Sequence, residues 1–336
     1  MKQKIQFWFR NARYTALPQS TLPAILAVSM AYKQPGFSWL YALLAIAGVL
    51  LGHLGINLFD DYFDYRRKES GYRNQLVREG MRARIAKCEY LTSGKATLNQ
   101  LLGACIIFCT LALAIGLVIL LKRGEVILYL MLITAVLGFS YSGPPLRLSY
   151  KGLGELQTGL MFGPLLIVGV YYAACGSWDF SLLFISIPVG LLVANILYTH
   201  SIMDYEPDLK VGKMTLAVLL KRKNIMLIVL GLFLFISYAF VCYGIFAHIL
   251  PAYYMAVMIT LPMAFGLLYL MIQFKKNPQK KFTPRFWMGP MPNWERIEKA
   301  GISWFMVRWC LARNLLSFFC LIIMIVNCFI SSTVTG

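Results

Sequence analysis

Long apolar stretches recur along the chain and constrain its fold more than any other feature. One of them, FSWLYALLAIAGVLLGHL (37–54), contains no Asp, Glu, Lys or Arg. A helix that crosses a bilayer needs about 20 mostly apolar residues. Nine stretches approach or exceed that length, at residues 18–34, 38–60, 97–121, 125–142, 153–175, 179–203, 223–246, 248–274 and 311–332. The sequence therefore predicts an all-α polytopic membrane protein with nine transmembrane helices.

The composition agrees with a membrane protein and gives no sign of a second domain. Charged residues make up 14% of the chain, against roughly 25% in soluble proteins. The mean hydropathy is +0.66. Because no Ser/Gly-rich linker divides the sequence, we expect a single membrane domain over residues 1–336, with cytoplasmic cap loops at about 61–95 and 204–222 and a basic loop at 275–310.

The net charge of +18 could suit a protein that binds nucleic acid, but the distribution of the charge favours a different explanation. Basic residues of membrane proteins are concentrated on the cytoplasmic side. All but Lys33, Lys122 and Arg123 lie in, or within three residues of, the N-terminal segment and alternate loops of the predicted topology. We therefore expect a lipid bilayer as the environment and no nucleic-acid partner. The N-terminus should be cytoplasmic and the C-terminus outside, in a bacterial cytoplasmic membrane.

A first acidic motif, NLFDDYFD, stands at the end of the second apolar stretch. Asn57, Asp60 or Asp61, and Asp64 are three, four and seven residues apart, so on a helix they share a face. Ionisable groups next to hydrocarbon usually mark a functional path, and clustered carboxylates need a cation. Ligands that offer only oxygen suit Mg²⁺.

A second acidic motif repeats the spacing of the first at the end of the sixth stretch. Asp204 and Asp208 lie 144 residues after Asp60 and Asp64, and the four helices in between return the chain to the same membrane face. This displacement predicts two four-helix pseudo-repeats of the parallel kind followed by a ninth helix.

The residues that follow Asp204 read YEPDLKVGKMTLAV. Pro207 disfavours a helical Glu206, so we expect Asp208 on a loop or at the start of a new helix. Gly212 would allow close approach of the backbone, and Lys213 would offer a point charge to a phosphate oxygen. Together the two acidic motifs and the lysines predict a cradle for a diphosphate bridged by Mg²⁺.

These motifs resemble the UbiA superfamily of intramembrane prenyltransferases over nearly the whole chain. DDYFD corresponds to the first motif of the family, and DxxxD followed by GKMTLAV corresponds to the second. A third stretch, YSGPPLRLSYKGLGELQTGLMFGPLLIVGVYY (141–172), is similar to the segment after the fourth helix of the 1,4-dihydroxy-2-naphthoate prenyltransferases of menaquinone biosynthesis.

The resemblance implies an enzyme that transfers a polyprenyl group from a polyprenyl diphosphate to an aromatic acceptor, most closely 1,4-dihydroxy-2-naphthoate. It implies Mg²⁺ as cofactor. The implied metal ligands and catalytic residues are Asp60, Asp61, Asp64, Asp204 and Asp208. The implied substrate-binding residues are Asn57, Lys151, Arg147, Lys213, Tyr141, Tyr198 and His200. In the family a basic residue of this loop faces the diphosphate, which points to Lys151, with Arg147 as the second candidate.

Two departures from the family pattern leave alternatives open. Asp60 stands where the first motif usually begins with Asn, although Asn57 lies one turn earlier. Met203 stands where quinone-pathway enzymes commonly carry Arg, so another aromatic or lipid acceptor remains an alternative. A membrane transporter would also use intramembrane carboxylates, but transporters bind near the bilayer midplane. The aspartates here fall at the expected cytoplasmic ends of helices, which favours the enzyme.

Overall fold

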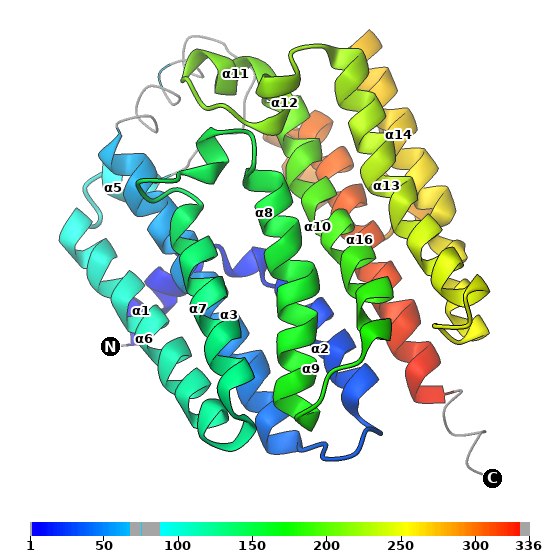
Figure 1. The fold of residues 1–336 in the computed structure, drawn as a ribbon. Helices are drawn as coiled ribbons and strands as arrows, with labels where there is room; N and C mark the ends of the chain where they lie inside the picture. Colours follow the sequence, from blue (N-terminus) through cyan, green and yellow to red (C-terminus); the bar gives the residue numbers. More distant parts are fainter. Residues whose placement is uncertain (1, 68–74, 76–87, 330–336) are drawn as a thin grey trace. The chain divides into compact units, whose positions relative to one another are not determined.

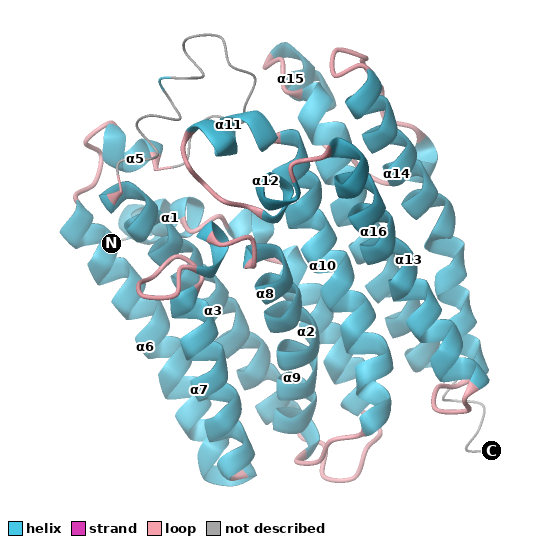
Figure 2. Cartoon of the chain, turned by 45° about the horizontal axis from the view of Figure 1, so that its top comes forward, coloured by secondary structure: helices cyan, strands magenta, loops and turns pink. Residues whose placement is uncertain are grey.

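The computed structural model describes residues 2–67, 75 and 88–329, and every regular element within them is a helix (Figure 2). This confirms the all-α prediction for the described part of the chain. Seven helices are long and apolar enough to cross a membrane. They are Trp39–Arg66, Leu98–Arg123, Gly154–Cys175, Phe180–Met203, Lys223–Phe246, Ala252–Lys276 and Ser303–Cys328.

The predicted number of nine spans is not confirmed. Helix α2 (Pro18–Ala31) and helix α7 (Glu125–Ser140) occupy the first and fourth expected stretches, but they have only 14 and 16 residues. Both are shorter than the ~20 residues that a full crossing needs. Within the described residues, seven of the nine expected stretches are candidate spans, and the other two are these shorter helices.

The chain divides into two compact units, the first made of residues 1–150 and 165–179. Its helices are α1 (Lys2–Asn11), η1 (Tyr14–Ala16), α2, α3 (Trp39–Arg66), α5 (Glu89–Thr92), α6 (Leu98–Arg123), α7, η2 (Leu148–Tyr150) and α9 (Leu166–Cys175). Helix α3 packs against α6 and α9, and α2 packs against α3 and α9 (Figure 1). Helix α3 is therefore the central element of this unit.

Small side chains allow α3 and α6 to approach each other closely. A Cβ added at Gly55 would lie 2.7 Å from Sγ of Cys109, and one added at Gly48 would lie 3.3 Å from Ile115. Helices in a bilayer associate without a hydrophobic driving force, so small residues that permit close contact stabilise the pair. Asp60 and Asp64 lie further along α3, and this contact holds the helix that carries them.

Local signals define both ends of α6. At the start, the Thr97 hydroxyl accepts from the Gln100 N–H at 3.3 Å, and the Gln100 side chain accepts from the Thr97 N–H at 3.0 Å. This reciprocal capping box satisfies amides that the first turn leaves unpaired. At the end, the Arg123 guanidinium donates to the carbonyl oxygens of Ala173 (2.8 Å) and Gly36 (2.9 Å). Arg123 therefore joins the end of α6 to the end of α9 and to the loop after α2.

The second unit contains residues 151–164 and 180–336. Its helices are α8 (Gly154–Leu160), η3 (Met161–Leu165), η4 (Phe180–Leu182), α10 (Leu183–Met203), α11 (Tyr205–Lys210), α12 (Leu216–Leu220), α13 (Lys223–Phe246), η5 (Ala252–Thr260), α14 (Leu261–Lys276), η6 (Phe286–Met288), α15 (Trp294–Lys299) and α16 (Ser303–Phe329). Helix α10 contacts α8, α13 and α16 and is the central element of this unit.

Glycines set the distance between α8 and α10 in the second unit. A Cβ added at Gly159 would lie 2.7 Å from the backbone oxygen of Gly190, which is too close for any real contact. The continuous helix that begins as α8 then passes through a π-helical turn containing Pro164. Proline has no N–H to donate and crowds the preceding turn, and π turns commonly absorb such a defect.

Two expected boundaries were wrong. The second expected span ended at residue 60, whereas helix α3 continues to Arg66; all three aspartates of the first motif are helical, as their shared helical face predicted. The last span begins at Ser303 rather than at 311. The reason is Arg308, which is fully buried inside α16 and donates to the carbonyl oxygens of Leu270, at 3.1 Å, and Trp304. Because the Arg308 guanidinium donates to these carbonyls, the charged residue does not interrupt the helix.

The contact between α8 and α10 gives a stability prediction. Gly159→Ala forces a methyl group against the Gly190 carbonyl and should destabilise the protein by about 1–3 kcal/mol. Unfolding in detergent micelles, followed by circular dichroism, measures this change. Gly231→Ala in α13 is the matched control, because an added Cβ there meets nothing within 4 Å. Equal free energies of unfolding for the two variants would contradict the predicted effect of this contact.

Candidate functional site

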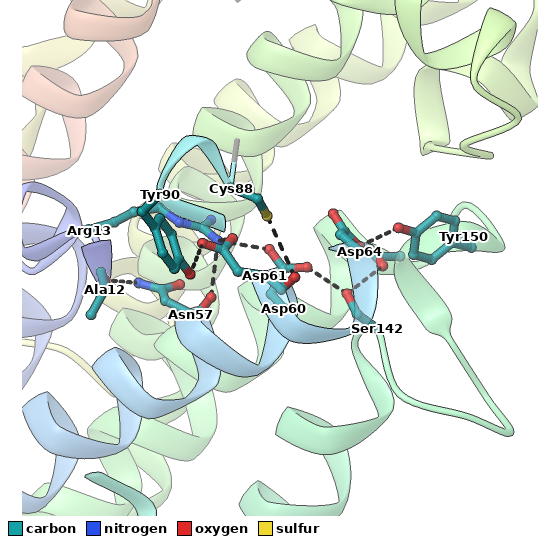
Figure 3. Close-up of polar contacts among 11 residues, drawn as sticks. Ala12, Arg13, Asn57, Asp60, Asp61, Asp64, Cys88, Tyr90, Ser142 and Tyr150 are labelled. Carbon is teal, nitrogen blue, oxygen red and sulfur yellow. Dashed lines mark hydrogen bonds and ion pairs between the residues drawn. The ribbon is translucent and has the colours of Figure 1, made fainter. Parts of the chain in front are cut away.

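The first acidic motif forms a buried cluster on the last turns of α3 (Figure 3). Asp60, Asp61 and Asp64 are only 7%, 2% and 4% exposed. Buried carboxylates are stable only with hydrogen bonds or positive partners. The described structure supplies such partners from the N-terminal segment, from the region of α5 and from the loop after α7.

Arg13, in the turn between α1 and η1, is the cationic partner of the cluster. Its guanidinium donates to the Asp60 carboxylate at 3.1 Å, to the Asp61 carboxylate and to the carbonyl oxygen of Asn57 at 3.0 Å (Figure 3). The Arg13 backbone has φ 62° and ψ 48°, a left-handed conformation. That conformation is unfavourable for residues other than glycine, so the ion pairs offset a local strain.

Tyr90, in α5, is the second partner of Asp61. Its hydroxyl donates to Oδ2 of Asp61 at 3.0 Å. Burial, and after it the Asp61 carboxylate, raises the pKa of the Tyr90 phenol, so the group remains a protonated donor. Phe7 and Trp8 of α1 meet the Tyr90 ring edge to face at centroid distances of 6.1 and 6.0 Å. Helix α1 thus holds the donor in place.

Hydroxyl groups of the segment 142–150 contact the other two aspartates. Ser142 donates to Oδ1 of Asp60 at 2.6 Å and lies 3.3 Å from the Ser149 hydroxyl. Tyr150 donates to Oδ1 of Asp64. Each donor restricts the orientation of one carboxylate, and this leaves the cluster with defined oxygen positions.

Sequence reasoning missed Arg13, Tyr90, Ser142 and Tyr150. Ser142 and Tyr150 lie inside the stretch 141–172 that the resemblance had singled out, so that stretch was the available signal. Arg13 counted only toward membrane orientation. Tyr90 carried no local signal, because one aromatic residue in a loop is usually a packing residue.

The other predicted residues of the first unit support the backbone around the cluster. The Asn57 amide donates to the Ala12 carbonyl at 3.0 Å and so holds the turn that contains Arg13. The Tyr141 carbonyl accepts from the Ser149 N–H at 2.9 Å. Arg147 lies between Tyr141 and Ser149 in sequence, and its backbone has a left-handed φ of 48°. Of the expected cap loop 61–95, residues 68–74 and 76–87 lie outside the described part of the chain.

The second acidic motif has the spacing of the first but a different backbone. Asp204 is fully buried at the C-terminal end of α10, and Nε2 of His200 lies 2.8 Å from its Oδ2. Asp208 lies in the separate short helix α11, where its N–H donates to the Asp204 carbonyl at 2.9 Å. The expectation of a new helix is confirmed. Glu206 is helical, contrary to expectation, because Pro207 falls in the first turn, where no amide is needed.

Gly212 and Lys213 close α11 with a Schellman motif. The Lys213 N–H donates to the Asp208 carbonyl at 2.9 Å, and the Gly212 N–H donates to the Leu209 carbonyl at 3.3 Å. This motif places a residue with positive φ after the helix, and Gly212 has φ +75°. A Cβ there would meet nothing within 4 Å, so within this chain glycine is required for conformation rather than for close approach.

The remaining predicted residues also lie in the second unit. Lys151 is exposed, and its neighbour Gly152 donates its N–H to the Met214 carbonyl at 2.7 Å. This hydrogen bond joins the loop of residues 151–153, here called the Lys151 loop, to the segment that contains Lys213. Tyr198 is fully buried, and its hydroxyl donates to the Met226 carbonyl at 3.1 Å, a contact between α10 and α13.

The donor set of the first motif fits Mg²⁺ with an incomplete protein shell. Carboxylate oxygens are the ligands that Mg²⁺ prefers, and it commonly binds one or two of them together with water and phosphate oxygens. Among the described residues, no three His, Cys, Asp or Glu side chains form a group that could hold a metal by itself. The carboxylates of Asp60 and Asp64 are of the kind that supplies part of an Mg²⁺ ligand shell.

The chain is similar to a named phytyltransferase and a named octaprenyltransferase. It is 33% identical over 181 residues to the 2-carboxy-1,4-naphthoquinone phytyltransferase of Synechocystis, covering 53% of this chain and 59% of that protein. It is 26% identical over 224 residues to the 1,4-dihydroxy-2-naphthoate octaprenyltransferase of Bacillus subtilis, covering 65% and 67%. The alignments thus span about three fifths to two thirds of these relatives.

Solved structures show the same fold. A UbiA homolog from Archaeoglobus fulgidus, bound to DMAPP and Mg²⁺, matches with a TM-score of 0.59 at 19% identity and covers 95% of this chain and 99% of its own. The family model described as the UbiA prenyltransferase family matches residues 21–294. The resemblance seen in the acidic motifs is thereby confirmed, and the chain belongs to the UbiA prenyltransferase family.

Proposed function

We propose that this protein catalyses the Mg²⁺-dependent transfer of a polyprenyl group from a polyprenyl diphosphate to an aromatic acceptor, 1,4-dihydroxy-2-naphthoate in menaquinone biosynthesis. The observation that carries the proposal is the buried Asp60/Asp61/Asp64 cluster, whose oxygens are oriented by fixed donors. The archaeal homolog bound to DMAPP and Mg²⁺ supports the donor and the metal. The names of the relatives support the acceptor.

Both acidic motifs act on the same donor diphosphate in this proposal. When bound, Mg²⁺ would neutralise the diphosphate as a leaving group. Asp60, Asp61, Asp64, Asp204 and Asp208 would supply its carboxylate ligands. Lys151 and Lys213, with Arg147 near the first of them in sequence, hold the phosphate oxygens as negative charge develops.

The reaction breaks the bond between the allylic carbon and the diphosphate oxygen, and a ring carbon of the acceptor then bonds to that allylic carbon and loses a proton. The apolar helices exclude water, which would otherwise capture the allylic cation.

The contact between His200 and Asp204 supports an orienting role for His200 within the second motif. The bond from Tyr198 to Met226 supports a packing role for that tyrosine. Tyr141 remains the aromatic candidate on the acceptor side.

The finer topology is part of the same proposal. If α2 and α7 also cross the bilayer, the chain crosses nine times, with a cytoplasmic N-terminus and an external C-terminus in a bacterial cytoplasmic membrane. The distribution of basic residues supports this orientation. The matched spacing of the two acidic motifs supports two four-helix pseudo-repeats followed by a ninth helix.

The acceptor is the part of the proposal that a product assay tests. Purified protein with Mg²⁺, polyprenyl diphosphates of several lengths and a panel of aromatic acids should yield a prenylated naphthoate, identified by mass. Met203, where the quinone-pathway enzymes commonly carry Arg, is buried at the end of α10. Prenylation of a different aromatic or lipid acceptor in preference to the naphthoate would contradict the acceptor assignment and leave the transferase reaction intact.

Removing one carboxylate from either motif should abolish turnover. Asp64→Ala and Asp208→Ala each take away a proposed metal ligand, and loss of one such electrostatic contribution typically costs about 10²–10³ in rate. Product formation measures the loss, and Mn²⁺ binding followed by electron paramagnetic resonance should weaken in parallel. Asp179→Ala, which changes an exposed aspartate far from both motifs in sequence, is the control. An active Asp64→Ala/Asp208→Ala double variant would exclude the proposed role.

Arg13 should stabilise the metal-free protein. Arg13→Gln leaves Asp60 and Asp61 without this guanidinium. Because the Arg13 side chain is 39% exposed, the cost should be about 1–2 kcal/mol, below the 3–5 expected for a fully buried pair. Unfolding in EDTA measures the loss, and saturating Mg²⁺ should recover part of it. The control is Arg10→Gln, an exposed arginine of α1. Equal stability of the two variants in EDTA would contradict the stabilising role.

A further inference from the structure

Glu155, in the first turn of α8, has a buried carboxylate that the proposed mechanism does not use. The residue is 3% exposed. No basic side chain among the described residues forms a salt bridge with it. Burial of a carboxylate without a cationic partner is unfavourable unless hydrogen bonds compensate. The identity of those hydrogen-bond donors therefore indicates what the carboxylate does.

The donors come from two segments on either side of the second acidic motif. The Ser201 hydroxyl, on α10, donates to Oε1 of Glu155 at 2.6 Å. The Leu216 N–H lies 3.3 Å from Oε1 and 3.4 Å from Oε2. Leu216 is the first residue of α12, and its amide is one of those that a helix start leaves without an intrahelical partner. The carboxylate supplies that partner.

Each of these contacts lies close in sequence to a proposed site residue. Ser201 precedes Asp204 by three residues on α10, and Leu216 follows Lys213 by three. Glu155 itself follows Lys151 by four residues. The bond from the Gly152 N–H to the Met214 carbonyl, at 2.7 Å, joins the same two loops a second time.

We infer that Glu155 is a positioning residue for the donor diphosphate. It joins the Lys151 loop, the end of α10 and the segment GKMTLAV, so that Lys151 and Lys213 are presented together to the phosphate oxygens. The inference rests on the proposed function and assigns Glu155 no contact with the substrate. A residue in this role should affect donor binding more than the chemical step or acceptor binding.

The exchange of Glu155 for glutamine should preserve most of this connection. Glutamine keeps one carbonyl oxygen, and Oε1 alone accepts from both Ser201 and Leu216. Alanine removes both interactions. The pair Glu155→Gln and Glu155→Ala therefore separates the effect of the hydrogen bonds from the effect of the charge.

The experiment measures donor affinity in two ways on the purified full chain. Steady-state kinetics give separate KM values for the polyprenyl diphosphate and the acceptor, and calorimetry gives the affinity for inorganic pyrophosphate in the presence of Mg²⁺. For Glu155→Ala, we expect the donor KM to rise and the pyrophosphate affinity to fall by about tenfold, the equivalent of about 1.4 kcal/mol. The acceptor KM should stay unchanged. Glu155→Gln should restore both donor values to within about threefold of wild type, since a shared hydrogen bond contributes about that much.

Ser201→Ala makes the inference testable even if Glu155→Ala does not fold. It removes one hydroxyl and should raise the donor KM by about threefold, the effect of one hydrogen bond. The double variant Glu155→Ala/Ser201→Ala should bind the donor no more weakly than Glu155→Ala, because the two residues act through one contact. Glu125→Ala, an exposed glutamate at the start of α7, is the control.

The outcomes separate this inference from the proposed function. Wild-type protein that neither transfers a prenyl group nor binds magnesium pyrophosphate would overturn the proposed function, and the inference with it. Wild-type turnover combined with an unchanged donor KM in Glu155→Ala, or in Ser201→Ala if Glu155→Ala does not fold, would overturn the inference alone. A fall in kcat with the same donor KM would also overturn it, because that pattern belongs to a general loss of structure or to the chemical step.

Discussion

The cost of burying carboxylates beside hydrocarbon governs the structure around the first acidic motif. Asp60, Asp61 and Asp64 are almost fully buried at the end of α3. Such groups require donors or cations, and Arg13 and Tyr90 come from segments before and after the helix. The need to satisfy the aspartates therefore determines the course of the chain around α3. Oriented carboxylate oxygens are also the ligands that a divalent cation such as Mg²⁺ prefers.

Close helix packing provides the frame for these polar groups. Lipid does not drive helices together, so contact depends on small residues that let backbones approach. Gly55 allows α6 to approach α3, and Gly159 and Gly190 allow α8 to approach α10. The first contact supports the helix that carries Asp60 and Asp64. The second supports α10, whose C-cap is Asp204.

The second acidic motif shows that equal spacing does not require equal structure. Asp60 and Asp64 are one turn apart on a continuous helix. Asp204 ends one helix and Asp208 belongs to the next, which a Schellman motif closes at Gly212. A short helix and a loop need support from outside, and the Glu155 carboxylate supplies it.

The sequence by itself determined the helical class, the positions of the apolar segments, both acidic motifs and the family, because these depend on local composition and spacing. Tertiary structure decided which donors surround the aspartates. Arg13 lies 47 residues from Asp60 and Ser142 lies 82 residues away, and no local pattern joins such distant positions. The buried Arg308 and the role of Glu155 were likewise decided by packing, since each depends on carbonyls or amides that only the folded chain brings within reach.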